Sequence, residues 1–217
     1  MKLRAHIDKV STFISSKGHD VEIALGEPAS TSELAAAASR LGISAFPPTI
    51  SDFFGTFANG MQIRWLTGEE EDSSFANVIV LPLNEAIDQH EKAKEYNPIW
   101  DEAYKFPYCK CPSLALQTAM DCRNYLNVID EGNGDAIAID LRFGIVRFNS
   151  HDWFDGGIGA NGWIMSSSLE QFLTTWSQRC FQVPKSLDWS TTLRPHGVDW
   201  NSDDFDRDFS LTASVWA

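Results

Sequence analysis

The feature that most constrains the fold is a set of three short β-rich runs, at residues 124–130, 135–141 and 145–149. Only two short connections, "EGNG" and "RFG", separate them, and both have the length and the glycine content that β-hairpins use. An antiparallel meander is the simplest arrangement of three runs connected in this way. The chain therefore has to supply further elements that cover at least one face of a sheet.

The first of these connections also resembles an acidic loop for a metal ion. A calcium loop of the EF-hand type that began at Asp130 would need oxygen ligands at its third and fifth positions. Gly132 and Gly134 occupy those positions and offer no side-chain ligand. We therefore interpret the stretch as a turn whose glycines tolerate positive φ.

Two helices and a strand are predicted before the first phenylalanine-rich segment. Apolar residues recur at helical spacing from Leu3 to Ile14, Gly18 ends that segment, and the strand-like run "VEIAL" follows. Ser30 and Glu33 form a capping-box pattern that starts a helix over residues 31–41.

A third helix and two strands are expected next. "FPPTISDFFGTFANG" predicts a helix that begins near Pro48, places four apolar side chains on one face and ends at Asn59-Gly60. "MQIRWL" and "ANVIVLPL" read as strands, and the pairing of the second ends at Pro82.

Two more helices complete the expected elements. One runs from Leu83 to Asn97-Pro98, and the other is "SSSLEQFLTTW", for which Ser167 and Glu170 predict a second capping box. Residues 100–120 have no clean period and are left unassigned.

These elements predict an α+β fold, in which helices pack on a central, mainly antiparallel sheet. The expected organisation is an N-terminal extension (1–30), a main domain (31–182) and an acidic C-terminal tail (183–217). One core is expected from the apolar faces, formed by Ile50, Phe53, Phe54, Phe57, Ile137, Ile139, Val146, Phe148, Leu169, Phe172 and Trp176.

Charge narrows the possible partners. The 217 residues include 30 acidic and 17 basic side chains, which gives a formal charge of −13. Such a charge opposes binding to nucleic acid and to anionic membranes, whereas basic proteins are attracted. Residues 1–18 contain no uninterrupted apolar run, so we expect neither a signal peptide nor a membrane span, and a cytoplasmic protein.

Motifs for cofactors and catalysis are incomplete. Gly157, Gly159 and Gly162 match the spacing of a dinucleotide-binding loop, but the motif neither follows a predicted strand nor opens a helix. Cys109, Cys111, Cys122 and Cys180 lack the paired spacing of structural zinc sites. His151-Asp152 ends a predicted strand and is interpreted as a loop contact rather than a general base. No cofactor and no enzymatic activity are expected.

A weak calcium pattern lies near the C-terminus. Asp199, Asn201 and Asp203 occupy the first three ligand positions of a calcium loop, but Asp204 replaces the glycine and Ser210 replaces the bidentate glutamate. A solvated acidic segment is the simpler interpretation.

Three stretches in order resemble the SUKH superfamily, which includes the yeast Smi/Knr regulator of cell-wall synthesis and many bacterial immunity proteins. "ISAFPPTISDFFGTFANGM" is similar to the family's proline, aromatic and Asn-Gly signature, with Phe46-Pro47-Pro48 in place of its usual Leu-Pro. "DAIAIDLRFGIVRFNSHDW" resembles its hairpin, and "SSSLEQFLTTW" its closing helix. The resemblance implies an α+β fold in which Asp140 and Gly144 flank the hairpin turn.

The function implied by the resemblance is that of an immunity protein, which binds and neutralises a toxin, often a nuclease. An acidic protein suits a basic toxin, since complementary charge increases the association rate. The candidate partner-binding residues are the acidic runs Glu69, Glu70, Glu71 and Asp72, and Asp199, Asp203, Asp204, Asp206 and Asp208. A regulator of the Smi/Knr type, or an enzyme whose residues meet only in three dimensions, remains an alternative.

Overall fold

The computed structural model describes residues 2–67, 75–96, 122–130, 134–150, 162–194 and 197–211. Within them a seven-stranded sheet has the order β1-β2-β3-β4-β5-β6-β7, and every neighbouring pair is antiparallel. The strands are β1 (Val21–Leu25), β2 (Met61–Leu66), β3 (Phe75–Val80), β4 (Tyr125–Asp130), β5 (Ala136–Asp140), β6 (Val146–Asn149) and β7 (Ile164–Ser166). The predicted α+β fold and the antiparallel meander are confirmed.

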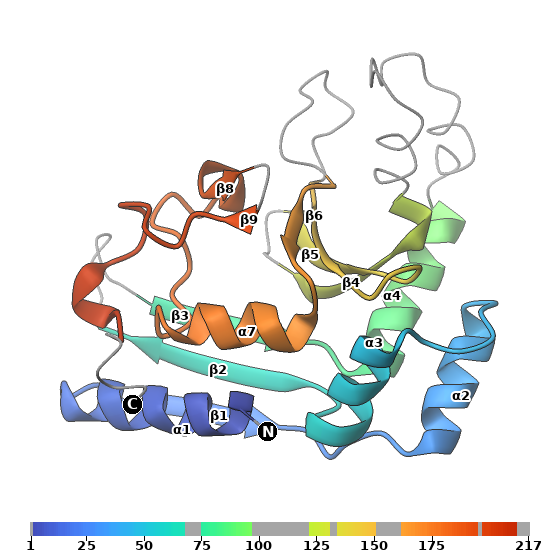
Figure 1. Ribbon diagram of the computed structural model, residues 1–217, viewed down its shortest axis with the longest axis horizontal. Helices are drawn as coiled ribbons and strands as arrows, with labels where there is room; N and C mark the ends of the chain where they lie inside the picture. Colours follow the sequence, from blue (N-terminus) through green and yellow to red (C-terminus); the bar gives the residue numbers. More distant parts are fainter. Residues whose placement is uncertain are drawn as a thin grey trace, which may run out of the picture.

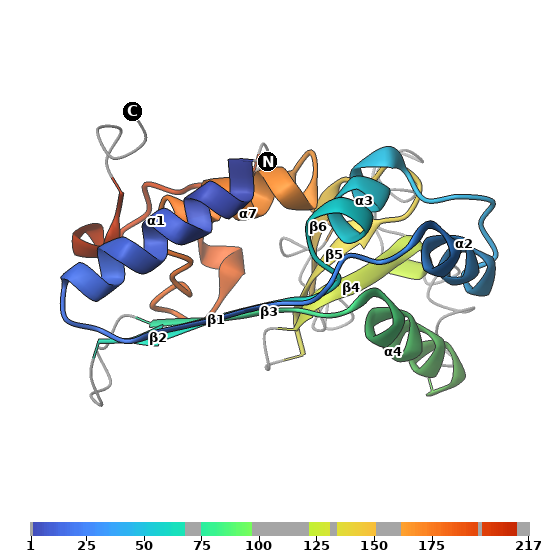
Figure 2. The same cartoon turned by 90° about the horizontal axis from the view of Figure 1, so that it is seen from below.

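Helices cover both faces of this sheet. They are α1 (Lys2–Ser16), α2 (Thr31–Arg40), α3 (Pro48–Asp52), α4 (Leu83–Tyr96) and α7 (Leu169–Ser177). Figures 1 and 2 show α1 and α7 side by side on one face of β1–β3, while α4 lies on the opposite side, towards β4. Near the C-terminus a second, two-stranded sheet is formed by β8 (Leu193–Arg194) and β9 (Gly197–Val198).

Local hydrogen bonds determine where two of the helices begin. Ser30 caps α2 through the reciprocal bonds with Glu33 that the sequence predicts. The second predicted capping box is wrong, because the N-cap of α7 is Ser168, whose hydroxyl accepts a hydrogen bond from the backbone N–H of Gln171. Ser167 instead contacts the side chain of Gln171.

The phenylalanine-rich segment is not one regular α-helix. The α-helix ends at Asp52, and Phe53–Phe57 form a single π-helical turn. The carbonyl of Phe54 accepts the backbone N–H of Ala29 at 2.8 Å, so the N–H of Ala58 bonds to the carbonyl of Phe53 instead. A tertiary hydrogen bond therefore widens this turn.

One core runs between the sheet and the helices. It contains every residue of the core predicted from the sequence, although Phe57 is only partly buried. Leu3 and Ile7 of α1 and Phe205 and Phe209 near the C-terminus belong to the same cluster. Both ends of the described chain thus contribute to a single folded unit.

Candidate protein-binding surface

The aspartates near the C-terminus lie on a segment that is packed tightly against α7. Trp189 and Trp200 from this segment contact Phe172 and Trp176 of α7, with ring centroids 4.9 to 5.9 Å apart. Phe205 packs on both of these tryptophans, at 5.6 and 6.2 Å. Aromatic pairs at such distances contribute beyond their buried area. The apolar part of the segment is therefore core, and only its polar part faces solvent.

Two polar side chains that follow α7 in the chain also hold the segment. The buried amide of Gln182 donates to the carbonyls of Asp206 and Phe209 and accepts the backbone N–H of Asp206. Arg179 donates to the hydroxyl of Ser210 at 2.6 Å and to the side chain of Asn201 at 2.9 Å. The carboxylates of this segment are thus presented from a fixed backbone.

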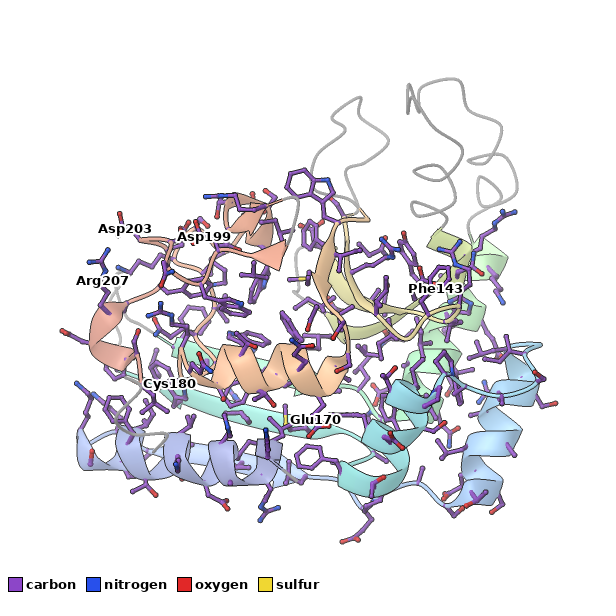
Figure 3. The ribbon with its side chains drawn as sticks, viewed as in Figure 1. Phe143, Glu170, Cys180, Asp199, Asp203 and Arg207 are labelled. Carbon is purple, nitrogen blue, oxygen red and sulfur yellow. The ribbon has the colours of Figure 1, made fainter. Side chains whose placement is uncertain are left out.

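The five predicted aspartates differ in exposure. Asp203 and Asp208 are exposed, whereas Asp199, Asp204 and Asp206 are half-buried. Asp199 pairs with Arg194 at 3.4 Å and Asp203 with Arg207 at 2.9 Å. Figure 3 shows Asp199, Asp203 and Arg207 together at one end of the molecule. Pairs as exposed as these contribute little to stability, so their charges remain available to a partner.

The second predicted run, Glu69, Glu70, Glu71 and Asp72, lies outside the described residues, in the connection between β2 and β3. The ends of these two strands lie beside the C-terminal segment. The ring of Trp65 stacks on Phe209 at 5.0 Å, and the backbone N–H of Val183 donates to the carbonyl of Phe75 at 3.1 Å. This proximity depends on tertiary packing, and no local pattern in the sequence indicates it.

Two side chains of the calcium pattern accept hydrogen bonds from arginines. The side-chain oxygen of Asn201 accepts a hydrogen bond from Arg179, and that of Asp203 accepts one from Arg207. Among the described residues, no group of three or more His, Cys, Asp or Glu side chains is placed to hold a metal ion.

Most candidates for catalysis, zinc binding or dinucleotide binding lie outside the described residues. They are His151, Asp152, Cys109, Cys111, Gly157 and Gly159. Cys180 is buried, and burial raises the pKa of its thiol to about 12. A thiol that stays protonated is a poor nucleophile and a poor metal ligand. Its carbonyl accepts the indole N–H of Trp65 at 2.7 Å, which gives this residue a structural role.

A buried cluster of ion pairs stabilises the β5–β6 hairpin. No pattern in the sequence indicates these pairs. The fully buried carboxylate of Asp140 pairs with Arg142 at 2.8 Å and with Arg147 at 2.9 Å. Arg147 also donates to the carbonyl of Gly162 at 2.7 Å. Gly144 completes the turn at a φ of 71°, where an added Cβ would clash with the hydroxyl of Thr49. The acidic and glycine residues of the hairpin therefore shape its backbone.

His90 is a buried titratable group between α4 and β4. Its Nδ1 lies 3.2 Å from the carbonyl of Tyr125, which requires a donating nitrogen there. Burial, together with the positive charge of Lys94, lowers the pKa of His90 to about 4. The folded protein therefore holds a neutral imidazole at neutral pH.

This pKa predicts acid sensitivity. Between the ordinary value of 6.5 and about 4, the unfolded chain binds a proton at His90 that the folded chain does not. The stability that depends on neutral His90 is thus present above pH 6.5 and is lost as the pH falls towards 4. Urea melts across this range should show a steeper loss for the wild type than for His90→Gln, which keeps a donor. Equal pH slopes for the two proteins would contradict the assignment.

None of the helices in the described part of the chain is long and apolar enough to cross a membrane. Comparison of the sequence with models of known protein families and with curated proteins finds no match in either group. A function for this chain therefore has to be argued from its own residues.

Proposed function

We propose that this chain is a non-enzymatic protein-binding domain that acts as an immunity protein of the SUKH type and neutralises a basic toxin. The observation that carries the proposal is the acidic segment from Asp199 to Asp208, whose backbone is fixed to the core while Asp203 and Asp208 face solvent. A preorganised charged surface binds with a smaller entropic cost than a flexible one. The net charge of −13 adds long-range attraction for a cationic partner.

The resemblance in sequence supports the toxin as the partner. Its three stretches correspond to the π-helical turn with α3, to the β5–β6 hairpin and to α7. A regulator of the Smi/Knr type would use the same elements to bind a partner that is not toxic. The nature of the partner therefore distinguishes an immunity protein from a regulator.

Salt and charge variants test the acidic surface. Replacing Asp203 and Asp208 together with asparagine should slow association with the proposed basic toxin by about threefold at low salt. The dissociation rate should change little, because rim charges act mainly on the encounter. Stopped-flow or surface-based kinetics at several salt concentrations would measure both rates.

A matched control removes the same amount of charge elsewhere. Asp52 on α3 and Glu85 on α4 are exposed. Figure 1 shows these two helices on the other side of the molecule from β8 and β9. Replacing Asp52 and Glu85 with Asn and Gln should leave most of the association rate intact. A separate variant with amides at positions 69–72 shows whether the other acidic run contributes. The proposal of an acidic binding surface is contradicted if the Asp203/Asp208 variant and the variant at positions 69–72 both associate as fast as the control at low salt.

A further inference from the structure

A second surface feature is a groove of about 650 Å³ at one end of β1–β3. Asp20, Glu22, Arg64, Leu66, Phe75 and Asn77 line it. Glu22, Arg64 and Asn77 are direct cross-strand neighbours, and Leu66 pairs with Phe75 in the next row. In Figure 2 the helices α1 and α7 lie over the opposite face of these strands. We name this feature the β1–β3 groove.

The β1–β3 groove combines an apolar wall with two carboxylates, and one of them, Glu22, forms a long and exposed ion pair with Arg64. Leu66, the last residue of β2, is 51% exposed and lies beside its cross-strand partner Phe75, so the two form a small apolar wall. The distance from Glu22 to Arg64 is 3.9 Å, too long for a hydrogen bond, and the Glu22 side chain is 77% exposed. Among the described residues, no ion pair is formed by Asp20.

The base of the groove is rigid. Trp65 lines it and is fixed on the inner side of the sheet by its hydrogen bond to the carbonyl of Cys180 and by stacking on Phe209. Its neighbour Ala76 is buried. A partner would therefore meet a preformed surface, which reduces the ordering cost of binding.

From this chemistry we propose that the β1–β3 groove receives a lysine or arginine side chain from an extended segment of a partner protein. The aliphatic stem of such a side chain would cover Leu66 and Phe75, and its charged head would reach Asp20 and Glu22. The carboxylates of Asp20 and Glu22 outnumber the guanidinium of Arg64, with His19 also in the lining, so these charged groups favour a cationic occupant over an anionic one. The inference rests on the proposed protein-binding function, but it concerns a surface distinct from the Asp199–Asp208 segment.

A defined peptide tests the proposal without a known partner. The probe is the blocked peptide Gly-Lys-Leu-Lys-Gly, and the comparison peptide carries glutamate in place of each lysine. Binding would be followed by amide NMR spectra of the full chain at low salt. The lysine peptide should shift the backbone amide signals of Asp20, Glu22, Leu66 and Asn77, whereas the glutamate peptide should shift none of them.

Variants give the proposal a quantitative test. Asp20→Asn with Glu22→Gln should weaken binding of the lysine peptide by about fivefold, as expected for exposed charge pairs. Leu66→Ser should weaken it as well, and all of these side chains are exposed or half-buried, so the fold should persist. The control pair, Asp203→Asn with Asp208→Asn, should bind the lysine peptide like the wild type.

Three results would overturn the proposal. They are the absence of peptide binding, shifts that map to residues 199–208, and groove variants that bind as well as the wild type. A dimer that is lost in Leu66→Ser would also overturn it, because a second copy of the chain would then occupy the groove. The test is separable from the toxin-binding proposal, since a chain that binds the peptide here but does not neutralise a toxin would refute only the latter.

Discussion

Replacing Phe172 with alanine is expected to lower the free energy of unfolding by about 3 to 5 kcal/mol. Phe172 is fully buried in α7, and its ring contacts Trp176, Trp189 and Trp200 at centroid distances of 5.3 to 5.9 Å. The substitution removes contacts that connect α7 to the C-terminal segment and leaves a cavity between three large, rigid rings. Such a site cannot collapse easily, which favours the upper part of the range.

Denaturant melts of the purified variant measure this effect. Phe143→Ala is the matched control, because Phe143 is 59% exposed at the tip of the β5–β6 hairpin, and its loss should change stability by less than about 0.5 kcal/mol. A loss below about 1 kcal/mol for Phe172→Ala would mean that the cluster of rings does not hold the C-terminal segment.

Replacing Asp140 with asparagine is expected to cost a similar amount, about 3 to 5 kcal/mol, because it breaks a buried ion pair from one side. Arg147 is 5% exposed and would keep a positive charge without its carboxylate. Arg142 would lose the same partner, to which it donates through Nε and Nη2. Asparagine has nearly the same volume, so the effect would report on charge rather than on packing.

An exposed pair of the same type provides the control. Asp203 and Arg207 are 93% and 79% exposed, so Asp203→Asn should change stability by less than about 1 kcal/mol. In the Asp140→Asn background, Arg147→Met should recover part of the loss, since it removes the uncompensated charge. Equal melting midpoints for Asp140→Asn and the wild type would show that the buried pair does not support the hairpin.

Local signals in the sequence were sufficient for most of the sheet. Glycine turns and alternating apolar residues located β2 to β6, and the pairing of Ser30 with Glu33 located the start of α2. The short strand β7 and the two-stranded sheet were missed, because runs of two or three residues carry no measurable period. The π-helical turn was missed because the hydrogen bond from Ala29 that causes it comes from a distant loop.

For the acidic segment from Asp199 to Asp208, the sequence alone predicts the charged residues but not how they are held in place. Five aspartates between positions 199 and 208 were evident, but their support by Gln182 and by Trp189 was not. Those side chains follow no helical or strand period, and their contacts form only when the C-terminal segment folds back on α7. The β1–β3 groove depends on the register of three strands, which the sequence pattern did not fix.

The most direct test of the central claim is co-expression of this chain with the product of the neighbouring reading frame. The account predicts that the neighbouring product is toxic alone, that this chain restores growth, and that the two proteins co-purify as a complex that salt weakens. Growth that is not restored, together with elution of this chain without the neighbouring product at low salt, would contradict it.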